Sequence, residues 1–519
     1  MPAIDYANSI AVLPPIEGVR ADRDYMDLLA TEARDAQNWL RREGRLRLRP
    51  GIIAIGDPIG ERPTTLLQYD HDDEDDRIVC ATTEGFHHYN KTTESWDDKT
   101  GAVLTSSANY PMIMRTFEYG GNRVVLMTNG IDAPRKWDGD TPTEVSLGGS
   151  PPKARCMAIA FNRVILGHLT SGAYAGEQNI DVSSSRNPDG GWNEGVQVEY
   201  LNDTEGDIMA MESIGNRRFG IYMEDAIQVA TAIGGDVPFR VDLAHKGIQG
   251  PVSAVACIPT PFGHVWLALD GSIRVFDGAN HRVLQRDESD DRIHVYIRNT
   301  MDWDLRKRSW LAYDPHMNEL HVHYAPIGQT DTVGGCIINM TDLSVWPVRW
   351  SEAMVCGRYS RYVSSIIYAD VVGTYADSEL LYEDYEVTRN RVLLMNESGQ
   401  FYEFYGADDD GTEITHFVET GLRAPQDPRF VHVLRHANHL LEPEEGGQEV
   451  TVQFGASQIG EDRKLEAAHV LDLSLGAGSL RETHHKLRGR FFCLRISGTN
   501  SGRIEWRGTQ VVGDIMGLI

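Results

Sequence analysis

The chain has 519 residues, of which 41% are hydrophobic and 24% charged, and its formal net charge is −27. This length exceeds one ordinary domain unless the chain is a repeat architecture, and no apolar run approaches the roughly eighteen residues of a membrane helix. The acidic balance disfavours ordinary nucleic-acid binding, in which Lys and Arg neutralise phosphates, although it allows a surface that DNA passes without sticking.

The N-terminal segment, residues 1–20, is apolar and contains Pro without a clear period, so we expect an extended arm. It carries acid and Pro where a secretory signal would carry basic residues and an apolar core, which predicts a protein made and kept in a cytosol. The cysteines are scattered with no CxxC pair, which predicts reduced core thiols and neither a disulfide framework nor a zinc site. They are Cys80, Cys156, Cys257, Cys336, Cys356 and Cys493.

Residues 21–45 predict one amphipathic helix. Apolar side chains recur at three- and four-residue spacing, at Tyr25, Leu28, Leu29, Ala36, Trp39 and Leu40. Arg41 and Arg42 lie in the expected last turn and Gly44 follows as a stop, which suits the helix dipole. We expect this stripe to pack on the rest of the chain, with docking on a neighbouring subunit as the alternative.

Residues 46–412 carry a repeated β pattern. Strand–turn–strand cores recur mostly every 40–55 residues or so, which suits one four-stranded propeller blade each with loop insertions. They begin near Arg77, Arg123, Arg163, Arg218, His264, Glu319 and Arg391. The last interval is longer and leaves room for an excursion, residues 368–384.

Three stretches repeat the same pattern of apolar run, polar turn and aromatic-containing run: residues 122–140, 263–280 and 390–411. Their Asp-Gly turns suit hairpins that need positive φ. A single four-stranded sheet cannot bury both faces alone, whereas a radial arrangement packs each sheet on its neighbours. We therefore expect an all-β protein with a six- or seven-bladed β-propeller; a stack of β-sandwiches is the alternative.

After the Asp-rich turn at 407–411 the pattern changes. Residues 413–519 hold alternating strands separated by polar turns, which predicts a C-terminal β-sandwich. The segment 422–430, with two prolines, is the expected boundary.

Candidate catalytic and metal-binding residues are few. Three histidine-containing stretches offer metal ligands, residues 87–90, 321–324 and His484-His485, but none has an obvious third ligand. The acidic run 70–76 lacks the spaced ligands and turn glycine of a known calcium loop. Glu224-Asp225 offers a general acid–base pair. No nucleophile, phosphate-binding or dinucleotide-binding motif occurs, so we expect no catalytic, cofactor-binding or metal residues and no enzyme.

The strongest enzymatic signal is the stretch SSSRNPDGGW, residues 183–192. It partly resembles the aspartate box of sialidase-like propellers, with Asn187 at the Asp position and Asp189 at the Gly position. That box is a structural turn even where it is intact. A propeller glycosidase or depolymerase acting on carbohydrate is therefore the alternative function.

A resemblance covers most of residues 33–519 as an ordered series of weak motifs. ARDAQNWLRREGRLRLRPGI (33–52) looks like the opening segment of propeller-type bacteriophage tail proteins. The match continues in AIAFNRVILG followed by SSSRNPDGGW, in WLALDGSIRVFDG and in AYDPHMNELHVHY. The stretch LLMNESGQFYEFYGADDDGTEITHFVETG, running into a terminal sandwich, is similar to the ending of this family.

The resemblance implies a virion structural protein, a tail nozzle or tail-tube component of a short-tailed phage. Such proteins form a ring, typically sixfold, around the DNA exit channel below the portal and adaptor. The implied partners are further copies of this chain, the portal and adaptor, fibre or needle proteins, and double-stranded DNA passing without specific binding. Assembly would take place in the bacterial cytoplasm and the product would reside in the virion tail, with no membrane insertion.

Overall fold

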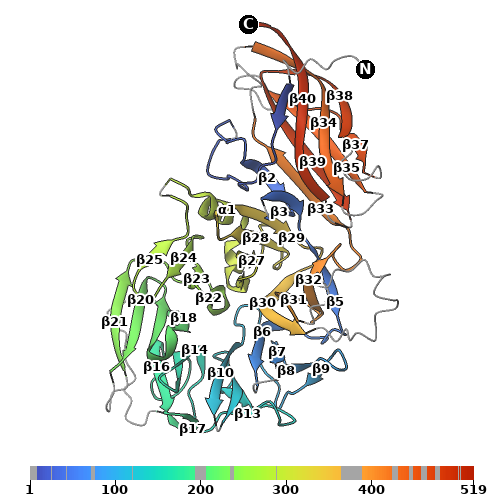
Figure 1. Cartoon of the computed structure of the whole chain (residues 1–519). Helices are drawn as coiled ribbons and strands as arrows, with labels where there is room; N and C mark the ends of the chain where they lie inside the picture. The colour runs from blue at the N-terminus through green and yellow to red at the C-terminus, as the bar shows by residue number, and fades with distance from the viewer. Residues whose placement is uncertain are drawn as a thin grey trace.

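The computed structural model describes residues 9–24, 26–42, 44–71, 76–119, 121–192, 206–233, 239–287, 289–363, 388–422, 430–443, 448–457, 464–473, 480–500, 502 and 504–518. Within these residues the protein is all-β, with seven four-stranded sheets and two six-stranded sheets (Figure 1). The four-stranded sheets form a β-propeller, and we number them blades 1 to 7. This confirms the predicted fold class and sets the blade number at seven.

The strands of each blade are given in sheet order, starting at the propeller axis. Blades 1 to 3 consist of β6 (Pro63–Asp70), β7 (Asp76–Thr82), β8 (Phe86–Asn90) and β9 (Ser95–Asp98); β10 (Ile113–Tyr119), β11 (Asn122–Thr128), β12 (Arg135–Trp137) and β13 (Val145–Ser146); and β14 (Ala154–Ala160), β15 (Arg163–Leu169), β16 (Gly176–Ser184) and β17 (Asn187–Trp192). Blades 4 and 5 consist of β18 (Ile208–Ser213), β19 (Arg218–Met223), β20 (Ala226–Ala232) and β21 (Phe239–Lys246); and β22 (Cys257–Thr260), β23 (Gly263–Leu267), β24 (Ile273–Phe276) and β25 (His281–Val283).

Blades 6 and 7 consist of β26 (Trp310–Asp314), β27 (Glu319–Tyr324), β28 (Gly334–Asn339) and β29 (Val345–Arg349); and β30 (Met354–Val363), β31 (Thr388–Asn396), β32 (Phe401–Gly406) and β5 (Gly51–Ile55). Short helices occur beside the blades: η2 (Gly215–Arg217), η3 (Ala254–Ala256), α1 (Arg292–Thr300) and η4 (Trp303–Arg308). Among the residues described, no helix has the length and apolar character to span a bilayer.

The propeller ring is closed by a strand from the other end of the chain. The innermost strands contact one another in order from β6 to β30, and β30 contacts β6 to complete the circle. Strand β5 supplies the outermost strand of blade 7, pairing antiparallel with β32 so that Phe401 lies opposite Ile55. Opening the ring at blade 7 therefore requires β5 to detach.

Two six-stranded sheets stand beside the propeller. The first contains β3 (Trp39–Arg42), β4 (Arg45–Leu48), β40 (Ile504–Leu518), β34 (Phe430–Pro443) and β38 (Leu480–Gly489), with β1 (Ser9–Val12) on β40. The second contains β2 (Ala33–Gln37), β33 (Ile414–Thr420), β39 (Phe491–Asn500), β35 (Glu449–Ser457) and β36 (Lys464–Leu465), with β37 (His469–Asp472) on β35. We call these sheets the two-sheet unit.

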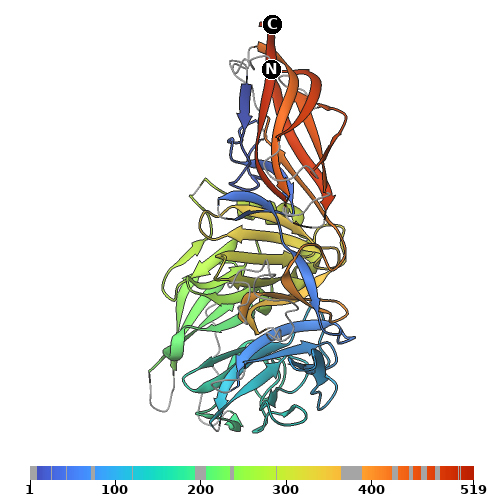
Figure 2. The same ribbon diagram turned by 45° about the vertical axis from the view of Figure 1, so that its right-hand side comes forward.

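The N-terminal strands belong to both parts of the molecule. Strands β2, β3 and β4 pair within the two-sheet unit, and β5 follows directly into blade 7. We call residues 33–55 the strap; in both ribbon views it lies between the two-sheet unit and the propeller (Figures 1 and 2). One hydrophobic cluster runs from the unit through the strap into blades 6 and 7, and includes Trp39, Leu46, Trp310, Trp346, Leu394, Leu434 and Trp506.

The predicted helix at residues 21–45 is wrong. Residues 33–42 form strands β2 and β3, and Asn38 between them adopts φ 63°, which interrupts any helix. Four apolar side chains of the expected stripe are buried all the same, Leu28, Ala36, Trp39 and Leu40, whereas Leu29 is exposed. Extended backbone here satisfies the edges of β33 and β40, which a helix would leave without partners. Tertiary pairing therefore overrides the local helical pattern.

The other boundaries compare closely with the expectations. Strand β1 lies in the segment predicted as an extended arm, the propeller strands run from Gly51 to Gly406 within the expected 46–412, and the strands after Ile414 form the C-terminal part of the two-sheet unit. That unit also takes four strands from residues 9–48, so the expected boundary at 413 omits a third of its strands. The expected excursion at 368–384 and most of the expected boundary segment 422–430 lie outside the described residues.

Candidate functional site

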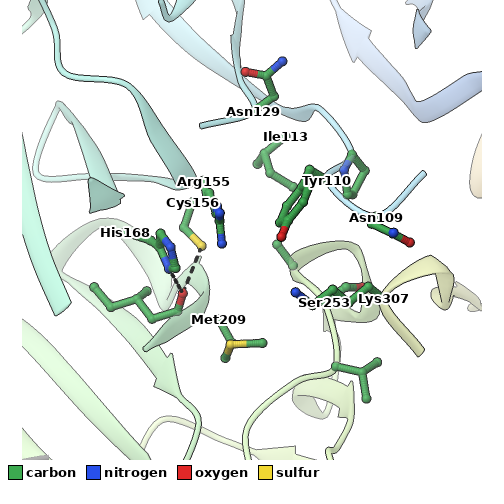
Figure 3. Close-up of a pocket in the computed structure, with 14 residues that line it drawn as sticks. Asn109, Tyr110, Ile113, Asn129, Arg155, Cys156, His168, Met209, Ser253 and Lys307 are labelled. Atoms are coloured by element: carbon green, nitrogen blue, oxygen red, sulfur yellow. Dashed lines mark hydrogen bonds between the residues drawn. The ribbon is translucent and has the colours of Figure 1, made fainter. Parts of the chain in front are cut away.

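A small pocket lies where the innermost strands of several blades begin (Figure 3). Its volume is about 70 Å³, enough for a few water molecules and far below the roughly 300–1,000 Å³ of a typical small-molecule site. Blades 2, 3 and 4, the segment before blade 5 that includes η3, and the helix η4 contribute residues. The lining consists of Asn109, Tyr110, Pro111, Ile113, Asn129, Arg155, Cys156, His168, Ile208, Met209, Val252, Ser253, Ala254 and Lys307.

Two cations in this pocket converge on one aromatic ring. The guanidinium carbon of Arg155 lies 4.4 Å from the ring centroid of Tyr110, and the ammonium of Lys307 lies 5.0 Å from it. Figure 3 shows Tyr110 between the side of the pocket that holds Arg155 and the side that holds Lys307. Cation–π attraction of this kind contributes about 0.5–2 kcal/mol depending on desolvation, so the ring of Tyr110 holds both cations in the pocket.

His168 stands at the edge of this pocket in an unusual backbone conformation. It is the single residue of β15 at a register irregularity with β16, between Gly167 and Leu169, and its φ is 55°. Its Nδ1 lies 3.1 Å from the carbonyl oxygen of Ile208. The imidazole is buried, and burial together with the nearby Arg155 lowers its pKa, so the ring is neutral at pH 7.

Two carboxylates approach His168 from neighbouring segments. Glu177 lies on β16 and Asp207 immediately precedes β18, and one ligand atom of each lies within 4.8 Å of the other and of a ring nitrogen of His168. A hydrogen bond between the two carboxyl groups and their mutual repulsion raise the pKa of Glu177. Blade 3 and the start of blade 4 thus bring one imidazole and two carboxyl groups together.

The interior of the ring holds further charged side chains. Arg115 on β10 donates a hydrogen bond to Glu212 on β18, across the width of blade 3. Arg358 on β30 is close enough to act electrostatically on both. Burial raises the pKa of Glu212 and lowers that of Arg358 to about 10. Side chains from three blades therefore occupy the axis of a single propeller.

The histidines that the sequence singled out take structural positions. His321 and His323 on β27 are at most 1% exposed; burial lowers the pKa of His321 to about 3 and holds that of His323 well below its usual value. The ring of His323 stacks on Trp310 with centroids 4.0 Å apart. His87 lies 3.4 Å from a carboxylate oxygen of Glu61. Neither pair belongs to a three-ligand cluster among the described residues.

The adjacent His484 and His485 point to different surroundings. His484 is exposed, whereas the side chain of His485 is fully buried. His485 lies with Glu466 and His469 in a second group of possible ligands. Both of its nitrogens already have hydrogen-bond partners, Thr483 and Glu466.

The stretch that resembles an aspartate box forms the turn between β16 and β17. Trp192 donates from its indole nitrogen to the carbonyl of Pro188 at 3.1 Å. Asp189 accepts from the backbone N–H of Gly148 at 2.7 Å and from the ammonium of Lys136. The segment therefore joins blade 3 to blade 2 and supplies no reactive group.

The remaining acidic candidates do not form a site. Glu224 and Asp225 occupy the turn between β19 and β20, where their carbonyl oxygens accept backbone hydrogen bonds. In the acidic run 70–76, Asp70 pairs with Arg123 at 2.9 Å, and residues 72–75 lie outside the described residues.

The residues around the pocket were not found from the sequence. His168, Glu177 and Asp207 lie on three segments, and Tyr110 and Lys307 come from blades far apart in the chain. No spacing in the sequence relates these residues to one another, because they become neighbours only when the propeller ring closes. The only local signal is the histidine directly after Gly167 inside an otherwise apolar strand, a pattern that suits a bulge.

The arrangement of the blades defines a β-propeller, and comparisons with known proteins extend no further than that. No protein-family model matches the chain, and no curated protein matches it. Among solved structures, U3-55K matches over 60% of this chain and 89% of its own, with 10% identity and a TM-score of 0.37. The WD40 repeats of RRP9 match over the same shares, with 10% identity and a TM-score of 0.38. YCF48 from Cyanidioschyzon merolae matches over 68% of this chain and 98% of its own, with 8% identity and a TM-score of 0.38.

Proposed function

We propose that this chain is a virion structural protein, a tail nozzle or tail-tube component that forms a homo-oligomeric ring around the DNA exit channel. The ring would be sixfold, as in the phage proteins that its motifs resemble. The observation that carries the proposal is the strap, residues 33–55, whose strands belong to both the two-sheet unit and blade 7. A nozzle subunit must keep its shape while DNA leaves under pressure, and one continuous segment that closes one part and completes the other supplies that rigidity.

The contacts of the strap support this reading. Arg49 is fully buried and holds the carboxylate of Asp409 through two hydrogen bonds of 2.8 and 2.6 Å. Its guanidinium also donates to Asn38 at 2.9 Å and lies 4.2 Å from the ring of Trp350. Asn38 in turn donates to the carbonyl of Thr415 in the two-sheet unit at 2.8 Å. Charge and amide groups therefore fix the strap between the two parts of the molecule.

The charge of the chain fits a passage for DNA. The net charge of −27 repels phosphates, so double-stranded DNA moving through a ring of such subunits would not lodge there, provided that acidic surface faces the lumen. The axis of a single propeller holds Arg115, Glu212 and Arg358, so the passage belongs to the ring of subunits. The proposed location is the virion tail below the portal and adaptor, beside fibre or needle proteins.

The alternative is a propeller glycosidase or depolymerase, and the carboxyl pair beside His168 is its best support. Glycosidase carboxyl groups stand about 5–5.5 Å apart in retaining enzymes and farther in inverting ones. Glu177 and Asp207 are closer and share a hydrogen bond. The pocket of about 70 Å³ is also too small for a sugar chain. Both facts favour the structural role and no enzyme activity.

Electron microscopy of the native particle that contains this chain, with symmetry left free, tests the proposal. We expect a closed ring of propeller subunits around a central channel, below a portal-like density. A lone, asymmetric or trimeric subunit with an open carboxylate-lined funnel would overturn it and favour the enzyme. A ring whose lumen is strongly basic would contradict the electrostatic part alone.

A further inference from the structure

The imidazole of His168 has one nitrogen occupied and one free. Nδ1 lies 3.1 Å from the carbonyl of Ile208, and a carbonyl only accepts, so Nδ1 carries the proton. Nε2 then presents a lone pair, is buried, and has no hydrogen-bond partner. The residue is 3% exposed. A buried polar atom without a partner is destabilising, so its presence in a native protein needs an explanation.

This protonation pattern is the one that metal-binding histidines adopt. A ligating imidazole usually donates its other N–H to a backbone carbonyl or a carboxylate, which fixes the ring and the tautomer. The backbone of His168 adopts φ 55°, which is unfavourable for a residue other than glycine, and its ring reaches the carbonyl of Ile208 in blade 4.

Two carboxylates lie close to the imidazole of His168. Glu177 and Asp207 each place an oxygen within 4.8 Å of a ring nitrogen of His168 and of each other. Gln178 donates to the carbonyl of Gly206 at 2.9 Å, which ties the neighbours of both carboxylates together. Two carboxyl groups so close repel when both are ionised. A bound dication would remove that repulsion.

We propose that His168, Glu177 and Asp207 bind one divalent transition-metal cation of the Zn²⁺ class, which links blade 3 to blade 4 beside the pocket. One imidazole nitrogen and two carboxylate oxygens suit Zn²⁺ and its neighbours in the first transition row, whereas Ca²⁺ and Mg²⁺ prefer oxygen ligands alone. Three protein ligands leave coordination positions for water, which the adjacent pocket can hold. The role we assign is structural, because the two segments it joins belong to different blades.

The second ligand group provides a control within the same chain. Glu466, His469 and His485 also lie within 4.8 Å of one another. However, His485 has partners on both nitrogens, at 2.6 Å to Thr483 and 2.5 Å to Glu466. A cation there would have to displace existing hydrogen bonds, so this group serves as the matched control for the first.

The test is Zn²⁺ binding to the full chain after chelator treatment, followed by calorimetric titration, with Co²⁺ absorption as a spectroscopic check of an imidazole–carboxylate site. We expect one cation per chain. His168→Gln and Glu177→Gln should each weaken binding about tenfold or more, since even outer contacts of a metal site change affinity 10–100-fold. His469→Gln should leave it unchanged. Zn²⁺ should raise the melting temperature of the wild type but not of Glu177→Gln.

Each contrary result is informative. Absence of Zn²⁺ binding by the wild type would overturn the site, as would unchanged affinity in both Glu177→Gln and His168→Gln. Loss of binding in His469→Gln alone would assign the cation to the control group. Glu177 is exposed, so its variant keeps the test open if replacement of the buried His168 prevents folding.

Discussion

Replacing Asp409 with alanine should loosen the strap specifically. The substitution leaves the guanidinium of Arg49 buried without its carboxylate, and breaking a buried pair in this way costs about 3–5 kcal/mol. Arg49 keeps its hydrogen bonds to the carbonyls of Pro50 and Arg349, at 2.8 and 2.9 Å, and to Asn38, so we expect the lower end of that range. An opening free energy lower by about 3 kcal/mol corresponds to roughly a hundredfold in the open population.

Hydrogen–deuterium exchange of residues 51–55 measures this opening directly, because β5 must detach from β32 before its amides exchange. We expect exchange to accelerate about a hundredfold in Asp409→Ala. The control is Asp242→Ala, which removes an ion pair with Arg240 whose side chains are 49% and 67% exposed; it should cost less than about 1 kcal/mol. If both variants change exchange in residues 51–55 equally, or neither does, the buried pair does not hold the strap.

Three further outcomes are expected. Burial lowers the pKa of His264 and of His416 to about 4, below the ordinary value of about 6.5, so the unfolded chain binds protons that the native chain does not. The free energy of unfolding, measured by urea denaturation, should be steady above pH 6.5 and fall toward pH 4 by up to about 1.4 kcal/mol per pH unit for each histidine. The variant His416→Gln should show a smaller slope. Gly51→Ala should lower the melting temperature sharply, because the added Cβ would lie 1.8 Å from the carbonyl oxygen of Asp408. The control Gly60→Ala, at φ 85° with nothing within 4 Å of the added Cβ, should lower the stability by only about 1–2 kcal/mol. An equal loss of stability in the two variants would contradict the steric argument. All six cysteines are free and buried, and burial raises the pKa of Cys156 and Cys356 to about 12. A thiol reagent at pH 8 should therefore react with the chain only after denaturation. Rapid reaction of the native chain would contradict this expectation, because it would show an accessible thiolate.

The sequence located every blade through a local pattern. Each of the seven predicted cores coincides with the second strand of a blade, from β7 to β31. Such strands are flanked by turns and read as apolar runs, because both faces of a blade are covered by its neighbours. The cysteines were also placed correctly, because scattered thiols in an apolar context are buried. These features depend on residues close together in the chain.

The strap could not be recognised in the same way. Trp39, Leu40 and the arginines after them fit a helix as well as a strand when only spacing is considered. Their partners are distant: Arg42 pairs with Glu319 at 3.1 Å, and Ala36 lies opposite Val418. These residues form strands because they pair with the open edges of sheets, and the other strands of those sheets come from the C-terminal hundred or so residues.

Turn chemistry and hydrophobic alternation were therefore enough to determine an all-β propeller with its blades in order, since both act over a few residues. The tertiary structure alone decided that the N-terminal strands close blade 7 and complete the two-sheet unit. It also decided that His168, Glu177 and Asp207 meet at one point. The physical reason is that pairing at a sheet edge and convergence at a propeller axis depend on where distant segments lie in space, and no local spacing encodes that position.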